Sequence, residues 1–188
     1  MSPRSHHSGD GLPYRWRATD SEVADRYPCD LLAAPGARRV VRAGDSSASA
    51  SVLYEWLKQL RVAPYSYDLL DNFGRRSPRN RTLGDRPLEV GQSFMTIFEL
   101  VDFEEGNSLT LRIRPGRAQR PWGPLVVTYR VRSTSTGSRL VCVMHVPFQG
   151  LAFSSVTMWT FLWGDLLMMR KQFRTLTELA AREDVSQP

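Results

Sequence analysis

One acidic residue, Asp165, stands in an otherwise uncharged and mostly apolar segment near the end of the chain. It lies three residues after Leu162 and four before Met169, so a helical arrangement would place its carboxylate beside a buried stripe. Burial among large apolar side chains raises the pKa of a carboxyl group, which can then act as a general acid or base. The second interpretation is that Asp165 pairs with an arginine, such as Arg112 or Arg130, or faces water.

A second group of side chains that could do chemistry follows a proline in the middle of the chain. Tyr65, Tyr67, Asp68, Asp71 and Asn72 fall within eight positions. Phenols and carboxylates at this density suit the mouth of a cavity, where they would orient a hydroxylated or carbonyl-bearing ligand. The alternative is that Asp71 and Asn72 cap or turn the chain while the tyrosines pack on a neighbouring helix. Tyr67 and Asp68 join Asp165 as the candidate proton-transfer groups.

The histidines and cysteines form no recognisable catalytic or metal-binding pattern. His6 and His7 lie near the N-terminus, and His145 shares a candidate strand with Cys142. Three residues apart on one strand, these two side chains point to opposite faces of a sheet. Cys29 and Cys142 show no metal-type spacing, and no nucleotide-binding or hydrolase signature is present. We therefore expect neither a metal nor a cofactor.

The element that must position Asp165 is a long C-terminal helix, expected over Phe153–Arg182. Thirty residues at helical rise span roughly 45 Å, which is enough to cross a small domain. The front half of this helix is apolar nearly all round and so requires a large concave partner. An aspartate at bilayer depth would cost ~2.5–3.5 kcal/mol, so we expect no stable membrane insertion. Apolar side chains recur in steps of three and four at Trp159, Leu162, Leu166, Met169, Phe173, Leu176 and Ala180.

The partner is predicted to be an antiparallel sheet. Hydrophobic alternation with a period of two and tight turns between successive runs indicate a meander of neighbouring antiparallel strands. A helix with Val52, Leu53 and Trp56 on one face precedes the meander and must stop near Ala63, because Pro64 follows. The fold class is therefore α+β. The expected strands are Arg38–Ala43, Ser93–Phe103, Ser108–Arg114, Leu125–Arg132 and Arg139–Val146.

Composition is that of one folded domain with an extension. The chain has 188 residues, 41% of them hydrophobic, and a formal net charge of +6. Residues 1–37 are rich in Ser, Pro, Gly and mixed charge, so we expect a flexible N-terminal extension, with any order confined to Tyr27 onward. The first residues show no apolar signal segment, which predicts a cytoplasmic protein.

Arginines between positions 75 and 86, together with Arg117 and Arg120, raise the question of a polyanionic partner. A nucleic-acid surface would interleave aromatic side chains for base stacking, and this run lacks them. We therefore expect a solvated face and no nucleic-acid partner.

The order of these elements resembles the START-like (SRPBCC) superfamily, whose fold is called helix-grip, in which a curved antiparallel sheet wraps around a long C-terminal helix. The resemblance covers about Arg38–Glu183, and it implies a START-like domain over 38–184. It rests on the opening RRVVRAGDSSASASVLYEWL, the strand meander and the ending WGDLLMMRKQFRTLTELA. The segment LRVAPYSYDLLDN also looks like that of a bacterial branch of the superfamily, to which the polyketide cyclase/dehydrase group belongs as well.

The resemblance implies a deep, mostly apolar cavity between sheet and helix. Tyr65, Tyr67, Asp68 and Asp71 are expected near its opening. The expected lining residues are Leu111, Ile113, Val127, Tyr129, Cys142 and Met144 from the strands, with Trp159, Leu162, Asp165, Leu166 and Met169 from the helix.

Two functions fit such a cavity. The first is binding of a lipid-like or polyketide-like molecule by a carrier or sensor, and the second is a cyclase or dehydratase that uses the Asp and Tyr groups. The expected partner is thus a hydrophobic small molecule, and a homodimer is compatible with either function.

Overall fold

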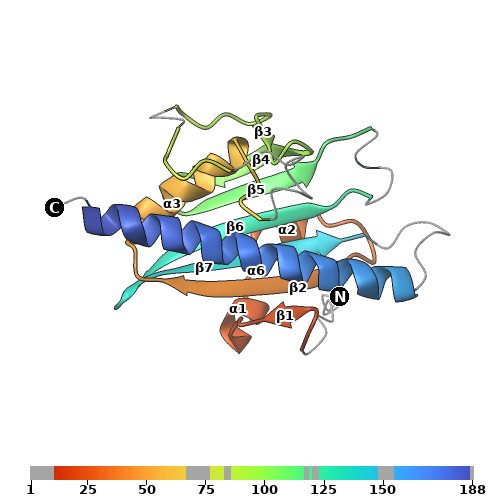
Figure 1. The fold of residues 1–188 in the computed structure, drawn as a ribbon. Helices are drawn as coiled ribbons and strands as arrows, with labels where there is room; N and C mark the ends of the chain where they lie inside the picture. The colour runs from red at the N-terminus through yellow and green to blue at the C-terminus, as the bar shows by residue number, and fades with distance from the viewer. Residues whose placement is uncertain are drawn as a thin grey trace.

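The computed structural model describes residues 11–66, 77–82, 86–116, 119, 123–147 and 155–186. One sheet of seven strands carries a long helix on one face and a short N-terminal segment on the other (Figure 1). Each strand pairs antiparallel with its neighbours, except that β1 runs parallel to β2. The α+β, antiparallel prediction is therefore confirmed. In spatial order the strands are β1 (Arg15–Trp16), β2 (Arg38–Ser46), β7 (Gly137–Val146), β6 (Val126–Thr134), β5 (Ser108–Ile113), β4 (Phe98–Glu104) and β3 (Ser93–Phe94).

The strand predicted over Ser93–Phe103 is wrong in one respect, because the chain breaks it into β3 and β4. Met95 and Thr96 between them have φ angles of 44° and 68°, in the left-handed region that ends a strand. The Met95 amide donates instead to the Leu60 carbonyl at 2.9 Å. This contact ties the edge of the sheet to the end of the preceding helix.

That preceding helix is α3 (Ala50–Lys58), continued by a 3₁₀ turn over Gln59–Arg61. The Ser49 side chain caps it by accepting a hydrogen bond from the Val52 amide. Leu53, Trp56, Leu57 and Leu60 are buried against the sheet, and the helical structure ends before Pro64. The predicted helix and its end are confirmed.

The long helix is α6 (Ser155–Ser186), which lies across the concave face of the sheet beside α3 (Figure 1). It extends beyond the predicted end at Arg182. Phe173 packs against the backbone of β2 at Gly44, where an added Cβ would lie 3.0 Å from the ring. Along the helix the buried stripe is formed by Met158, Leu162, Leu166, Met169, Phe173, Leu176 and Ala180.

Trp159 is the one member of the predicted stripe that lies outside it. Its side chain is 57% exposed, and Met158 is buried in its place. Met158 precedes Leu162 by four residues and Trp159 precedes it by three, so the two residues flank the same stripe, and Met158 is the one whose side chain is buried.

The N-terminal segment also differs from prediction. From Gly11 on it forms β1 and two short helices, α1 (Asp20–Ala24) and α2 (Pro28–Leu31). The expectation of a flexible extension is therefore wrong for residues 11–26, while order from Tyr27 onward was allowed for. Figure 1 shows α2 behind the sheet, on the face opposite α6. There the segment closes a second apolar cluster formed by Ala18, Tyr27, Cys29, Val41, Ala43, Val126, Val141 and Val143.

Candidate functional site

The candidate site begins with a row of side chains across the middle of the sheet. Arg42 on β2 is paired with Cys142 on β7, and Cys142 is paired with Tyr129 on β6. Directly paired residues of antiparallel strands point to the same face. These three side chains therefore lie side by side beneath α6, on the face where the sequence places Asp165.

Asp165 is held by one arginine. Its Oδ2 accepts a hydrogen bond from Arg42 Nη2 at 3.1 Å, and the two side chains are 12% and 1% exposed. Burial raises the pKa of Asp165, and the Arg42 guanidinium offsets that rise only in part. The predicted partners of Asp165 are wrong, since Arg112 pairs with Glu99 and Arg130 with Asp25.

One donor atom of the Arg42 guanidinium, Nε, is left without an acceptor among the described residues. Nη1 donates to the Tyr14 carbonyl at 3.0 Å, and Nη2 donates to Asp165. The Nε atom is buried and has no hydrogen-bond partner within the described residues. A carboxylate that binds an arginine side-on uses Nε and one Nη together, so Asp165 fills only half of this edge.

A second polar contact connects α6 to the sheet two turns further along. The Tyr129 hydroxyl donates to Gln172 Oε1 at 2.8 Å, and Gln172 Nε2 donates to the Pro64 carbonyl at 2.6 Å. Burial raises the pKa of Tyr129 well above its ordinary value, so the phenol stays neutral and can donate. Gln172 was not predicted, although its position three after Met169 and four before Leu176 puts it on the buried stripe.

Most of the predicted lining residues are brought together. They are buried between the sheet and the helices, with Trp159 the exception noted above: Leu111, Ile113, Val127, Tyr129, Cys142, Met144, Leu162, Leu166 and Met169. Tyr65 is buried too, and its ring meets that of Trp56 edge-on at 6.0 Å, as the packing alternative for the tyrosines required. Tyr67, Asp68 and Asp71 lie outside the described residues.

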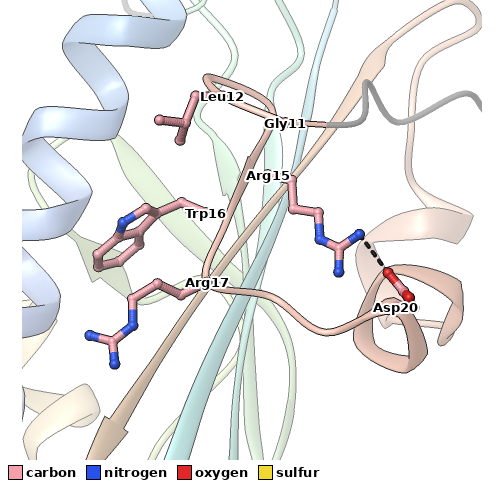
Figure 2. A pocket seen from close by; sticks show the side chains of 6 residues that line it. All are labelled: Gly11, Leu12, Arg15, Trp16, Arg17 and Asp20. Atoms are coloured by element: carbon pink, nitrogen blue, oxygen red, sulfur yellow. Dashed lines mark ion pairs between the residues drawn. The ribbon is translucent and has the colours of Figure 1, made fainter.

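The linings of two hollows on the described surface contain none of the residues predicted to line the cavity. The larger, of about 650 Å³, lies beside β1 and is lined by Leu12, Trp16 and their neighbours (Figure 2). The smaller, of about 350 Å³, lies between Arg61 and Gln92. Neither contains Asp165.

The opposite face of the sheet holds a contrasting carboxylate, Asp30 on α2. Its Oδ1 lies 2.6 Å from His145 Nε2 and 3.1 Å from Arg39 Nε, and its Oδ2 accepts from the Tyr27 amide at 2.7 Å. Burial raises the pKa of Asp30, but these partners outweigh it and hold the pKa at about 2. His145 thus faces α2 while Cys142 lies under α6, as predicted.

Cys29 lies next to Asp30, and atoms of Cys29, Asp30 and His145 that could bind a metal lie within 4.8 Å of one another. The Arg39 guanidinium occupies the same carboxylate, so its charge is already balanced. Burial raises the pKa of the Cys29 thiol to about 11, and the thiol donates to the Val143 carbonyl. This cluster is therefore best understood as a structural contact between the N-terminal segment and the sheet.

No family model matches the chain, and no curated protein matches it. Among solved structures, Ara h 8.0201 is 10% identical, with a TM-score of 0.51 over 78% of this chain and 99% of that one. The protein MLL2253 from Mesorhizobium loti is 16% identical, with a TM-score of 0.48 over 78% and 99% of the two chains.

A third similar structure is the di-domain ARO/CYC StfQ from the steffimycin biosynthetic pathway. It is 11% identical, with a TM-score of 0.48, and the match covers 77% of this chain and 51% of StfQ. Identities this low compare folds alone. With its curved antiparallel sheet wrapped around α6, the chain has the helix-grip fold.

Proposed function

We propose that the protein binds an apolar small molecule, lipid-like or polyketide-like, between the sheet and α6 and acts as its carrier or sensor. The observation that carries this proposal is the Arg42–Asp165 pair, buried in a layer whose other members are mostly apolar. In this arrangement the pair would hold the polar end of the ligand, and the surrounding side chains would cover its apolar body.

The energetics of the pair favour a role beyond stability. A buried ion pair often stabilises a fold no better than well-packed hydrophobic residues of the same volume, because both charges lose their hydration. Here the raised pKa of Asp165 marks a desolvated carboxyl group, and Arg42 Nε lacks an acceptor in the described part of the chain. A ligand oxygen placed at Nε would satisfy that donor.

The packing around the pair suits a ligand that must displace or shift side chains. Met158 and Met169 lie on the buried stripe on either side of Asp165, and Met144 lies on β7. Methionine side chains are unbranched and adapt to different shapes with little loss of contact. The hydrogen bonds of Gln172 hold the second half of α6 to the rest of the fold. The side chains that can shift around a ligand are therefore those of the first half of the helix, before Gln172.

The second candidate function is a cyclase or dehydratase. The raised pKa of Asp165 favours it, because a carboxyl group that protonates nearer neutrality can both donate and accept a proton. Tyr67 and Asp68 remain the proposed further proton-transfer groups, and Asp71 remains a proposed group at the opening. Asp165→Asn separates the two functions: lost turnover with retained binding indicates an enzyme, and retained binding without any turnover in the unmodified protein indicates a carrier.

The test is titration with an apolar fluorescent probe, comparing Leu166→Trp with Leu167→Trp. Leu166 is buried on the stripe and Leu167 is exposed on the next position of the same helix turn. Extra volume at Leu166 should fill the proposed binding space and weaken probe binding at least tenfold, whereas the same change at Leu167 should leave it intact. Thermal unfolding of both variants serves as the control for folding. Equal probe binding by the two variants would contradict the proposed location.

A further inference from the structure

The outer side of α6 exposes large apolar side chains along its first turns. Val156, Trp159 and Leu167 are exposed, and Trp163 is half-buried with its ring 5.6 Å from that of Trp159. At 100° per residue these four positions fall within about 80° of one another, on a flank of the helix next to the buried stripe. Single exposed apolar residues are ordinary on protein surfaces, but a row of four that includes two tryptophans calls for an explanation.

The exposed charges of α6 between Ser155 and Thr177 are all basic. Between Ser155 and Thr177 the only acidic residue is Asp165, which is buried with Arg42. The basic residues Arg170, Lys171 and Arg174 follow directly after the apolar row and are exposed. Arg174 is paired with Glu178, which leaves Arg170 and Lys171 nearest to the row. The outer side of α6 therefore changes from apolar to basic along its length.

The N-terminal segment extends this surface. Trp16 packs edge-on against Phe173 at 6.0 Å, and the guanidinium of Arg170 lies 5.7 Å from the Trp16 ring centre. Figure 2 shows Leu12, Trp16 and Arg17 on the side toward α6, while Arg15 reaches the other way to Asp20. Leu12 is exposed, and the Arg17 guanidinium lies 5.8 Å from the centre of the Trp16 ring. We call the combined set the front surface: Val156, Trp159, Trp163, Leu167, Leu12 and Trp16, bordered by Arg17, Arg170 and Lys171.

We propose that the front surface docks on membranes that contain anionic phospholipids, with α6 lying in the plane of the headgroups. Tryptophan and aliphatic side chains enter the boundary between headgroups and acyl chains, and neighbouring arginines and lysines bind the lipid phosphates. No helix in the described part of the chain is long and apolar enough to cross a bilayer, so the docking is peripheral. This inference stands apart from the proposed ligand site, which lies on the inner side of the same helix.

A lipid surface fits these residues better than a second copy of the chain. A second copy would bring two chains together that each carry a net charge of +6, which disfavours their association. The apolar row also stands on the outside of a single helix, which forms a ridge. A bilayer can take up a ridge without a matching groove.

The test is flotation with phosphatidylcholine vesicles, with and without added phosphatidylglycerol. The full-length protein should float with the anionic vesicles and much less with the neutral ones, and added salt should release it. Each basic side chain at an anionic surface contributes about 1 kcal/mol, or roughly fivefold in binding. Binding of Arg170→Gln/Lys171→Gln to anionic vesicles should therefore fall by at least tenfold.

The apolar row is tested by Trp159→Ser/Leu167→Ser, which should also reduce flotation at least tenfold. The matched control is Leu31→Ser, since Leu31 is 91% exposed but belongs to α2 on the opposite face of the sheet. The residues replaced in Trp159→Ser/Leu167→Ser and in Leu31→Ser are all exposed, so circular dichroism should show that both variants fold like the unmodified protein.

Several outcomes would overturn the proposal. Absence of flotation with anionic vesicles would do so, as would equal flotation of Trp159→Ser/Leu167→Ser and Leu31→Ser. A concentration-dependent doubling of mass in light scattering that Trp159→Ser/Leu167→Ser abolishes, without vesicle binding, would assign the front surface to a homodimer. None of these results bears on probe binding at Leu166, so the two proposals can fail separately.

Discussion

Each face of the sheet holds a carboxylate paired with an arginine, Asp30 on the outer face and Asp165 on the concave face, and the two sites are built in opposite ways. On the outer face, Asp30 accepts hydrogen bonds from His145, Arg39 and the Tyr27 amide. On the concave face, Asp165 accepts from Arg42 alone among the described residues. The pKa of Asp30 is held at about 2, while that of Asp165 is raised.

The difference separates a structural charge from a functional candidate. A buried carboxylate with several donors keeps its charge at no net penalty, and it fixes the elements that supply those donors. A carboxylate with one donor in an apolar layer still lacks partners, which a bound ligand can supply. On this basis Asp30 holds the N-terminal segment to the sheet, and the Arg42–Asp165 pair is the site that we propose for the polar end of a ligand.

The largest effect should come from breaking the concave pair. Arg42→Met leaves the Asp165 carboxylate buried without its partner, and such changes typically lower the free energy of unfolding by ~3–5 kcal/mol. Replacing both residues, as in Arg42→Met/Asp165→Leu, removes both charges and should recover most of that loss. Urea unfolding of the three proteins at neutral pH measures the comparison. A double variant as unstable as Arg42→Met would show that the pair itself is needed for folding.

A smaller effect is expected on the outer face. Since the pKa of Asp30 falls from 3.8 to about 2 in the folded protein, its ionisation contributes about 2 kcal/mol at neutral pH. The sign follows from the depressed pKa: the contribution is complete above pH 3.8 and is lost as the pH falls toward 2. Asp30→Asn should therefore lower stability at pH 7 and have little effect at pH 2.

Hydrogen exchange provides the local measurement for that prediction. The amides around α1 and α2 should exchange faster in Asp30→Asn at neutral pH, while those of α6 stay protected. Uniform loss of protection across both faces would contradict a role confined to the N-terminal segment.

The fold could be predicted because its main elements carry strong local patterns. The alternation in Ser108–Ile113 and the stripe from Leu162 to Ala180 each appear within one segment of the sequence. The N-terminal segment carries no such pattern, because α1 and α2 have only five and four residues. Its order comes from contacts with distant strands, such as those of Asp25 with Arg130 and Arg132.

The candidate site was predictable only in part for the same reason. Asp165 is conspicuous in the sequence as a lone charge in an apolar helix. Its partner Arg42 lies 123 positions away on a strand that contains other arginines. Both faces of β2 are buried, and the sequence does not show this because the N-terminal segment, which covers the outer face, carries no local pattern of its own. Pairing across such distances is decided by the sheet register, which the sequence does not display.

Native mass spectrometry of the protein as purified tests the central claim most directly, by comparing the unmodified chain with Arg42→Met/Asp165→Leu. If the Arg42–Asp165 pair holds the polar end of an apolar ligand, the unmodified protein should carry an added small-molecule mass that gentle activation removes. The double variant, which should remain folded, should lack that mass. The account would be contradicted if the unmodified protein carried no bound molecule even after incubation with a cell lipid extract. It would also be contradicted if the unmodified protein and the double variant carried the same bound mass.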